Sequence, residues 1–349
     1  MNNPIEKPLI TDINLHQLED KLLSMGEAKY RAKQVWEGIY HSQAADFVSI
    51  SNLSIAFRQK LNDQFAYNSL TPLVEVHSSD KQTTKVLFET NDNKKIETVL
   101  MKYNERNTLC ISTQSGCAMG CVFCATGQMG FFRSLSPGEI VEQVLHFSRQ
   151  LKLINEKVTN IVFMGMGEPF HNYEATIKAV DLLGDVDGYN MGARRLTIST
   201  VGIIPQIMRF ADEKRQVNLA VSLHSIDDEV RSNMMPVNKK YPVNDLLKAC
   251  AYYINQTNRR VSFEWALIDG TNDSVDMARR LTNKLRSLLC HVNLIQLNPT
   301  NKYSGKGSSK DTAEKFKNTL EQEGIPCTIR LRRGIDIHAG CGQLATSTN

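Results

Sequence analysis

Three cysteines in one short run offer the most distinctive chemistry of this 349-residue chain. They stand in Cys117-Ala-Met-Gly-Cys121-Val-Phe-Cys124, a C-x3-C-x2-C pattern. Thiolate is the preferred ligand of iron–sulfur clusters, and three thiolates this close along the chain can hold three corners of a cubane cluster. Three ligands leave one iron open, much as catalytic metal sites keep a position for a substrate. The pattern therefore predicts chemistry rather than structural support.

A zinc site or a set of structural cysteines is the alternative to a cluster. Zinc sites usually combine two Cys pairs, or a Cys pair and a His pair, and the sequence has no second pair. The other cysteines are scattered singly: Cys110, Cys250, Cys290, Cys327 and Cys341. The N-terminus lacks the apolar segment of a secretory signal, so we expect reduced thiols in the cytoplasm. No apolar run reaches about 18 residues, so we expect no transmembrane helix.

Strand-length apolar runs and helical patterns alternate from residue 108 onward. The runs are 109–112, 160–164, 195–199, 217–223, 261–267, 292–297 and 327–331. The helical patterns lie near 137–151, 173–184, 204–214, 243–256, 273–289 and 311–323. Such alternation predicts parallel strands with helical crossovers. Six repeats fit an α/β fold with a partial (β/α)6, TIM-like barrel over 108–345, and a doubly wound sheet stays open as the alternative.

Two smaller segments precede the barrel. Residues 1–72 read as a helical accessory domain, because positions 29–40 place Val35, Trp36, Ile39 and Tyr40 on one helical face. Its basic residues either lie on a surface that faces only solvent or contact RNA, and the chain's net charge of +4 is compatible with either role. Residues 73–107 read as a linking β-hairpin, because strand patterns at 84–89 and 95–100 flank a turn signal at 91–93.

Polar residues stand at the carboxyl ends of nearly all the expected strands, where such folds bind ligands. They are Cys117, Cys121 and Cys124; Gly165, Gly167 and Glu168; Ser199, Thr200 and Gly202; Ser222 to Ser225; Asn298; and Cys341. Phe170 replaces the third glycine of a dinucleotide fingerprint, whereas Glu168 suits an ammonium group. Taken alone, Gly-Glu-Pro is also typical of a turn, and His224 of a core histidine.

With these residues in place, the chain resembles the radical S-adenosylmethionine (SAM) superfamily and, within it, the RlmN and Cfr family of RNA adenine methyltransferases. The resemblance runs from about Arg31 to Leu344 and is carried by 110–117, 130–135, 164–169 and 339–344. It implies a [4Fe–4S] cluster on Cys117, Cys121 and Cys124, with SAM on the open iron. The SAM-binding residues that it implies are Gly167, Glu168, Ser199, Ser222, Leu223, His224 and Asn298.

The resemblance also implies roles for three residues outside the triplet. Cys341 would carry a methyl group, Cys110 would resolve a covalent protein–RNA intermediate, and Glu97 would accept a proton. Two SAM molecules would be consumed per methylation, and a disulfide between the two cysteines would follow. An aromatic C–H is a poor nucleophile, so a radical route explains why these thiols are needed. The family usually has two alanines before the methyl-carrying cysteine, and Gly340 here predicts a looser backbone.

The implied substrates are adenosines of 23S ribosomal RNA and of transfer RNA. Proline after Glu168 matches the RlmN pattern and favours 2-methyladenosine. Cfr-like C8 methylation, which gives antibiotic resistance, is the close alternative; a metal-stabilised RNA-binding protein without catalysis is the distant one. We expect a monomer, a flavodoxin or ferredoxin electron donor and no membrane partner. The basic residues that could contact RNA are Arg330, Arg332, Arg333, Lys302, Lys306 and Lys310.

Overall fold

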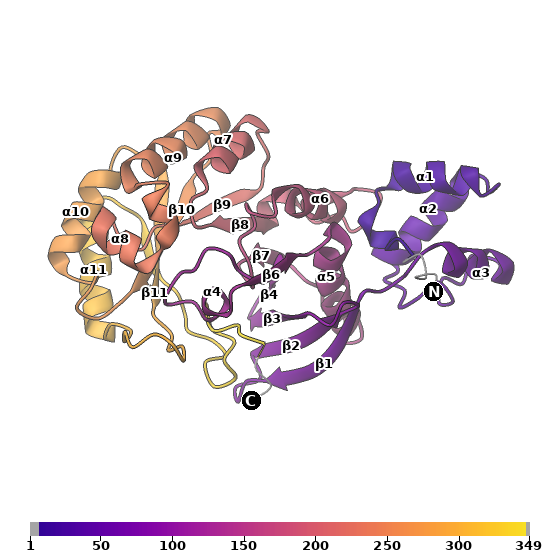
Figure 1. The fold of residues 1–349 in the computed structure, drawn as a ribbon, viewed down its shortest axis with the longest axis horizontal. Coiled ribbons are helices and arrows are strands. Elements are labelled where there is room, and N and C mark those ends of the chain that lie inside the picture. Colours follow the sequence, from indigo (N-terminus) through magenta and orange to yellow (C-terminus); the bar gives the residue numbers. More distant parts are fainter. Residues whose placement is uncertain (1–6, 347–349) are drawn as a thin grey trace.

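One curved sheet of ten strands organises the computed structural model, which describes residues 7–346 (Figure 1). The strand order is β1-β2-β3-β4-β7-β8-β9-β10-β11-β12, and the strands from β4 to β12 are parallel. The parallel strands are β4 (Arg106–Cys110), β7 (Asn160–Phe163), β8 (Leu196–Thr200), β9 (Asn218–Ser222), β10 (Val261–Leu267), β11 (Cys290–Gln296) and β12 (Cys327–Ile329). In the described part of the chain, β1 and β12 are the two edge strands of the sheet and do not pair with each other. The barrel is therefore open, which confirms the expected partial barrel.

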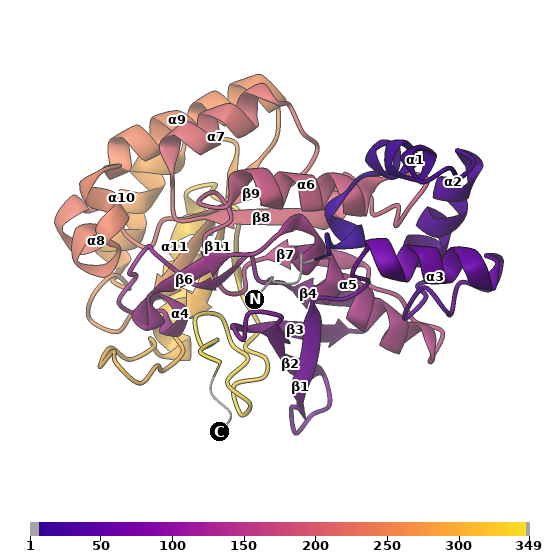
Figure 2. The ribbon, with the colours of Figure 1, turned by 45° about the vertical axis from the view of Figure 1, so that its right-hand side comes forward.

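Each parallel crossover contains a helix that packs on the outside of the sheet (Figure 2). The six expected helices are α5 (Pro137–Lys152), α6 (Tyr173–Gly184), α7 (Ile204–Asp212), α9 (Val243–Thr257), α10 (Val275–Leu285) and α11 (Lys310–Gln322). Local sequence sets their starts: in α5, Ser136 and Glu139 form a capping box and Pro137 takes the first turn. The apolar face of α5 is buried against the sheet.

Three antiparallel strands extend the same sheet beyond β4. They are β1 (Leu70–His77), β2 (Thr83–Thr90) and β3 (Lys95–Tyr103). The expected hairpin is β2–β3, and β3 pairs with β4 so that Val99 lies opposite Cys110. Side chains of directly paired residues share a face of the sheet. Glu97, Val99 and Met101 therefore lie on the face of β3 that carries Cys110 on β4.

The N-terminal helices stand to one side of the barrel (Figure 1). They are η1 (Ile10–Asp12), α1 (Leu15–Ser24), α2 (Tyr30–Trp36), the π-helical turn η2 (Glu37–His41) and α3 (Ile55–Gln64). Val35, Trp36, Ile39 and Tyr40 are buried, as their spacing predicts. Asp12 accepts a hydrogen bond of 2.7 Å from the backbone N–H of Gly138 and so joins this region to the start of α5.

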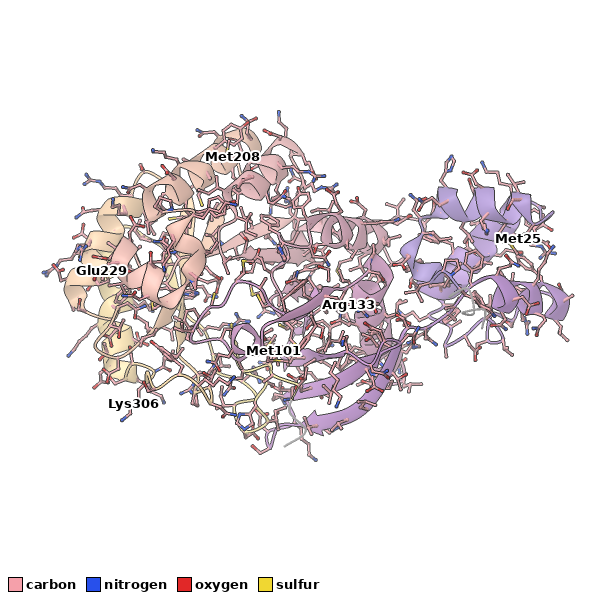
Figure 3. The ribbon with its side chains drawn as sticks, viewed as in Figure 1. Met25, Met101, Arg133, Met208, Glu229 and Lys306 are labelled. Carbon is pink, nitrogen blue, oxygen red and sulfur yellow. The ribbon has the colours of Figure 1, made fainter. Side chains whose placement is uncertain are left out.

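A second group of short elements covers the carboxyl ends of the strands. They are β5 (Gln114–Gly116), α4 (Ala125–Met129), β6 (Phe131–Ser134), α8 (Asp228–Met234) and η4 (Pro236–Lys239); the short η3 (Ala193–Arg195) instead directly precedes β8, at its amino end. The hairpin β5–β6 frames the cysteine run, and Arg133 of β6, labelled in Figure 3, bridges Asp92 and Glu139. Among the described helices, none is long and apolar enough to cross a membrane.

Candidate active site

A cavity at the carboxyl ends of the strands collects most of the residues that the sequence singled out. Its walls include Cys110, Cys121, Cys124, Gly167, Glu168, Ser199, Ser222, His224, Asn298 and Cys341. Met101, labelled in Figure 3, also lines it. Three predicted site residues do not line it: Glu97, Cys117 and Leu223. The fold thus brings candidate functional residues on, or just after, β4, β7, β8, β9 and β11 into one cavity.

The cysteine run forms a loop between β5 and α4, held by backbone hydrogen bonds. The N–H of Cys117 donates to the carbonyl of Gly130 over 2.8 Å, and that of Cys124 donates to Cys121 over 3.2 Å. Gly116 has a φ of +72°, and a Cβ there would lie 2.0 Å from the Gly130 carbonyl oxygen, so only glycine fits this entry to the loop. The chain therefore turns sharply enough to bring the three thiols together.

Burial sets the electrostatics of these thiols. It raises the pKa of Cys117 to about 12 and that of Cys121 well above the ordinary thiol value. Cys124 adds to the shift of both because its charge would repel theirs. Three mutually repelling thiolates need a cationic partner, which iron supplies. Among the described residues, no three His, Cys, Asp or Glu side chains converge tightly enough for a single metal ion. The donor set of the loop, three cysteine thiolates, is the one that iron–sulfur clusters use.

Gly167 and Glu168 form the wall beside the cysteine loop. Gly167 has a φ of +99°, and a Cβ there would lie 2.5 Å from the Cβ of Gln114. The buried carboxylate of Glu168 accepts hydrogen bonds from the backbone N–H groups of Phe170 and Val201, at 3.0 and 2.9 Å. Burial raises the pKa of Glu168 to about 7, and these hydrogen bonds partly oppose that rise. A bound ammonium group would favour the charged carboxylate.

His224 lies in the opposite wall with a φ of +56°. Its Nδ1 accepts the N–H of Ala266 over 2.8 Å, so the proton of the neutral ring is on Nε2. Burial, together with the nearby charge of Arg231, lowers the pKa of His224 to about 3, so the ring is neutral at ordinary pH. The side chain of Leu223, by contrast, is in the hydrophobic core, and its carbonyl accepts a hydrogen bond from Arg231.

The C-terminal segment folds over the cavity and brings Cys341 to the cavity wall opposite β4. Several hydrogen bonds hold its backbone; among them, Ala125 donates to Gly342 over 2.7 Å, Asn298 donates to Cys341 over 3.1 Å, and Thr126 donates to Leu344 over 2.7 Å. Cys341 is partly open to solvent, yet the surrounding protein desolvates its thiol and raises its pKa. Both Cys110 and Cys341 are free thiols.

Gly340 lies in closely packed surroundings. A Cβ on Gly340 would lie 2.7 Å from the side-chain amide nitrogen of Asn298 and 2.7 Å from Oε1 of Gln343. The N–H of Gly340 donates to that same Gln343 oxygen over 3.1 Å. Glycine at this position lets two side chains approach the backbone closely, and the looser backbone expected from the residue type stays a prediction.

Glu97 is buried on β3, outside the cavity wall but on the same face of the sheet as Cys110. Its Oε1 lies 2.8 Å from Nζ of Lys85, and its Oε2 accepts the backbone N–H groups of Ala345 and Thr346. The carboxylate of Glu97 thus contacts both Lys85 and the C-terminal segment.

Known proteins match the whole chain. The radical SAM superfamily model matches residues 111–281, and that of the ribosomal RNA large subunit methyltransferase N-terminal domain matches residues 10–66. The dual-specificity RNA methyltransferase RlmN 1 of Myxococcus xanthus is 46% identical over 342 residues, 97% of this chain and 95% of its own. A probable dual-specificity RNA methyltransferase RlmN of Staphylococcus saprophyticus is 43% identical, with 97% and 93% covered. This chain belongs to the RlmN family of radical SAM methyltransferases.

A solved structure confirms the fold of this RlmN family member. The crystal structure of a radical SAM methyltransferase from Sphaerobacter thermophilus superposes with a TM-score of 0.96 at 46% identity. The match covers 97% of this chain and 100% of that one. The superfamily's cofactors, a [4Fe–4S] cluster and SAM, are therefore those of this chain.

Sequence reasoning missed several residues of this RlmN-family site. Glu264 lines the cavity from the middle of β10, where it reads as an ordinary strand residue. Buried Arg231 donates to the carbonyls of Val201, Ser222 and Leu223 and so ties two strand ends together, although its sequence resembles an exposed helix. Arg330, named at first only as an RNA contact, lines the cavity and acts electrostatically on Cys110 and Cys341.

The remaining basic candidates differ in their surroundings. Arg332 donates to Asn298 over 3.2 Å, and Arg333 stacks over Tyr103 with its guanidinium 4.5 Å from the ring centroid. Lys302, Lys306 and Lys310 are exposed, and Lys306 is labelled in Figure 3. The two arginines line the cavity, whereas the lysines do not: Lys302 and Lys306 lie on the loop before α11, and Lys310 begins that helix.

Proposed function

We propose that this protein makes 2-methyladenosine in 23S ribosomal RNA and in transfer RNA, through a methyl group carried by Cys341. The observation that carries the proposal is that Cys110 and Cys341 line one cavity with Cys121, Cys124 and Glu168. Cluster binding and SAM binding require neither of the two lone cysteines. Their position beside the proposed cofactor site supports a covalent role for both. The relatives are named dual-specificity RNA methyltransferases, which supports two RNA substrates.

The cofactor-binding residues follow from the walls of the cavity. Cys117, Cys121 and Cys124 would hold the cluster, and Glu168 would accept the ammonium group of SAM. Gly167, Ser199, Ser222, Leu223, His224 and Asn298 would line the rest of that site, Leu223 through its backbone. When bound, the cluster and SAM supply a 5′-deoxyadenosyl radical, which removes hydrogen from an unreactive methyl group.

The chain's own residues would then complete the reaction. The methyl carbon on Cys341, after losing a hydrogen, would be joined to C2 of adenine. The ring would then have to give up one electron, which the oxidised cluster could accept when bound, and its C2 proton, which Glu97 would take up. The Cys110 thiolate would attack the Cys341 sulfur, so that a disulfide forms, the sulfur–carbon bond breaks, and the carbon keeps the electron pair and takes up a proton. The target base must leave its stack to reach this cavity, and Arg332 and Arg333 are placed to grip the adjoining backbone.

Cfr-like methylation at C8 is the second candidate, because the two thiols would serve either carbon. Gly167-Glu168-Pro169 and relatives named RlmN favour C2. We further propose a cytoplasmic monomer that receives electrons from a flavodoxin or ferredoxin. An enzyme that accepts two different RNAs must recognise the exposed base more than the surrounding nucleotide sequence.

Anaerobic reconstitution with iron and sulfide, followed by reaction with 23S ribosomal RNA and transfer RNA, tests this proposal. We expect about four irons per chain, 5′-deoxyadenosine as a product, and 2-methyladenosine in both digested RNAs. Formation of 8-methyladenosine without 2-methyladenosine would favour the Cfr-like reaction instead. A protein that binds RNA but holds zinc and cleaves no SAM would support the non-catalytic alternative.

A further inference from the structure

One buried ion pair touches both ends of the segment that carries Cys341. We call residues 338–346 the Cys341 loop. At its start, Nζ of Lys85 lies 3.4 Å from the carbonyl oxygen of His338. At its end, Oε2 of Glu97 accepts the N–H groups of Ala345 and Thr346, at 2.9 and 3.2 Å. Nζ of Lys85 and Oε1 of Glu97 are 2.8 Å apart, so one pair of charges closes the loop.

Strand register explains how this pair forms. Lys85 of β2 lies opposite Val99, and Leu87 lies opposite Glu97, so Lys85 and Glu97 are diagonal neighbours on one face. Diagonal positions are about 7–8 Å apart, a gap that a long lysine side chain spans. Val99 also lies opposite Cys110, which places the pair on the face of the sheet that carries the second thiol.

Burial makes each member of the pair depend on the other. The side chains of Lys85 and Glu97 are 6% and 1% exposed. Among the described residues, Glu97 Oε1 makes no well-aligned hydrogen bond, so the ammonium group of Lys85 is what compensates it. A buried carboxylate that loses its cation is strongly disfavoured. Without Lys85 we therefore expect the carboxylate of Glu97 to turn toward water, which alters its hydrogen bonds to the loop.

The charge on Glu97 matters for the loop itself. Hydrogen bonds from N–H groups to a carboxylate are roughly twice as strong as those to a neutral acceptor. The middle of the loop is held only by neutral groups: Ala125 donates to Gly342, and Asn298 donates to Cys341. The two ends near Lys85 and Glu97 are thus the points where a single proton changes how firmly the loop is held.

We propose that Lys85 is a positioning residue that, through Glu97, clasps the Cys341 loop shut, and that a proton on Glu97 opens the clasp. A neutral carboxyl group attracts neither the ammonium of Lys85 nor the two N–H groups as strongly. The link to catalysis rests on the proposed function. If Glu97 takes the ring proton of adenine, the same proton frees the loop after the carbon–carbon bond has formed. Cys341 is then released to meet Cys110.

Hydrogen exchange of the full-length protein, read by mass spectrometry, tests the clasp without any RNA. In Lys85→Met and in Glu97→Gln we expect amides of residues 338–346 to exchange at least about tenfold faster than in the wild type. Lys85→Arg, which keeps the charge, should restore slow exchange. Lys102→Met is the matched control: Lys102 lies on β3 and pairs with exposed Glu156 over 3.0 Å, and exposed pairs contribute little. It should leave the loop unchanged.

The outcomes separate the clasp from a general loss of structure. Faster exchange confined to the loop supports the proposal. Loop exchange at the wild-type rate in both variants overturns it, as does faster exchange spread evenly over β7, β8 and β9. Glu97→Gln keeps the shape of the side chain and serves if Lys85→Met fails to fold. The proposed function is judged separately by nucleoside analysis of the wild type, so the failure of one proposal is not read as failure of the other.

Discussion

Cys110 and Cys341, distant in the sequence, line one cavity so closely that a charge on Cys341 acts on the thiol of Cys110. Burial raises the pKa of Cys110 to about 12, and a negative charge on Cys341 contributes to that rise. Arg330 opposes it and lowers the pKa of both thiols. Its guanidinium lies 3.8 Å from the sulfur of Met164, on the same wall. The site therefore keeps Cys110 protonated and unreactive, with one cation placed to favour its thiolate.

Arg330→Gln should slow the step in which Cys110 attacks Cys341. Removing the cation raises the pKa of Cys110, and each unit of that rise lowers the thiolate fraction about tenfold. The covalent RNA adduct should persist longer at pH 8 and disappear faster as the pH is raised. Gel analysis of adduct decay between pH 7 and 10 measures this. Arg330→Lys keeps a charge and should be much closer to wild type; an unchanged pH profile in Arg330→Gln would argue against the electrostatic role.

Glu168→Gln should weaken SAM binding by about tenfold or more, because a charge-assisted hydrogen bond becomes a neutral one. The amide oxygen can still accept the N–H of Val201, so the fold should survive. Because burial raises the pKa of Glu168 to about 7, the wild-type carboxylate is charged above pH 7 and neutral below it. Affinity of the wild type should therefore fall as pH drops through 7. Anaerobic equilibrium dialysis at pH 6 and 8 gives both results; equal affinities for wild type and variant would exclude the assigned contact.

His224→Asn should make stability less sensitive to acid. The folded pKa, about 3, is below the ordinary value of 6.5, so the unfolded chain binds a proton first as pH falls. This stability is present above pH 6.5 and is lost between 6.5 and 3, at about 1.4 kcal/mol per pH unit. Asparagine tolerates the positive φ of this position. Urea unfolding at pH 7 and pH 5 should show wild type losing roughly 2 kcal/mol more than the variant. Equal losses would mean that His224 is not held neutral by the fold.

Gly340→Ala should move the Cys341 loop rather than unfold the protein. The new methyl group would meet Asn298 and Gln343 at 2.7 Å, which is too close for either side chain to stay. Overpacking of this kind typically costs about 1–3 kcal/mol, and the loop can relieve it by shifting outward. We expect a melting temperature within a few degrees of wild type and a clearly slower methylation rate. Gly192→Ala, at a position with open space around it, is the control. A methylation rate equal to that of Gly192→Ala would show that the tight packing around Gly340 does not contribute to activity.

The sequence predicted the strands and crossover helices of the barrel better than the short elements at the carboxyl ends of the strands. Apolar runs and helix starts such as Ser136-Pro137 depend on local patterning, so all seven parallel strands and six crossover helices were found. The elements β5, β6, α4 and α8 were missed because they are short and are held by contacts to distant segments. Val122, for example, donates to Met234 over 3.0 Å.

Residue type was enough to predict the site residues that belong to chemically distinctive types. It did not predict those whose role depends on which elements pack around them. The cysteines and Glu168 can be identified as candidates from residue type and spacing alone. Glu264 and Arg231 are ordinary charged residues that gain their place only when β10 and α8 pack against the strand ends. Gly340 illustrates the limit most clearly, because glycine serves both loose and crowded backbones, and only the neighbouring Asn298 and Gln343 decide which.

The covalent intermediate of the Cys110→Ala variant tests the central claim most directly. Without the Cys110 thiol, the bond between Cys341 and adenine cannot be broken by attack on sulfur. We therefore predict that this variant, reconstituted and reacted with RNA, accumulates a covalent protein–RNA adduct, whereas Cys341→Ala forms neither adduct nor methylated RNA. Nuclease and protease digestion followed by tandem mass spectrometry should recover the peptide containing Cys341, joined through one carbon to C2 of adenosine. Free, normally methylated RNA from Cys110→Ala, or a crosslink at any other residue, would contradict the account.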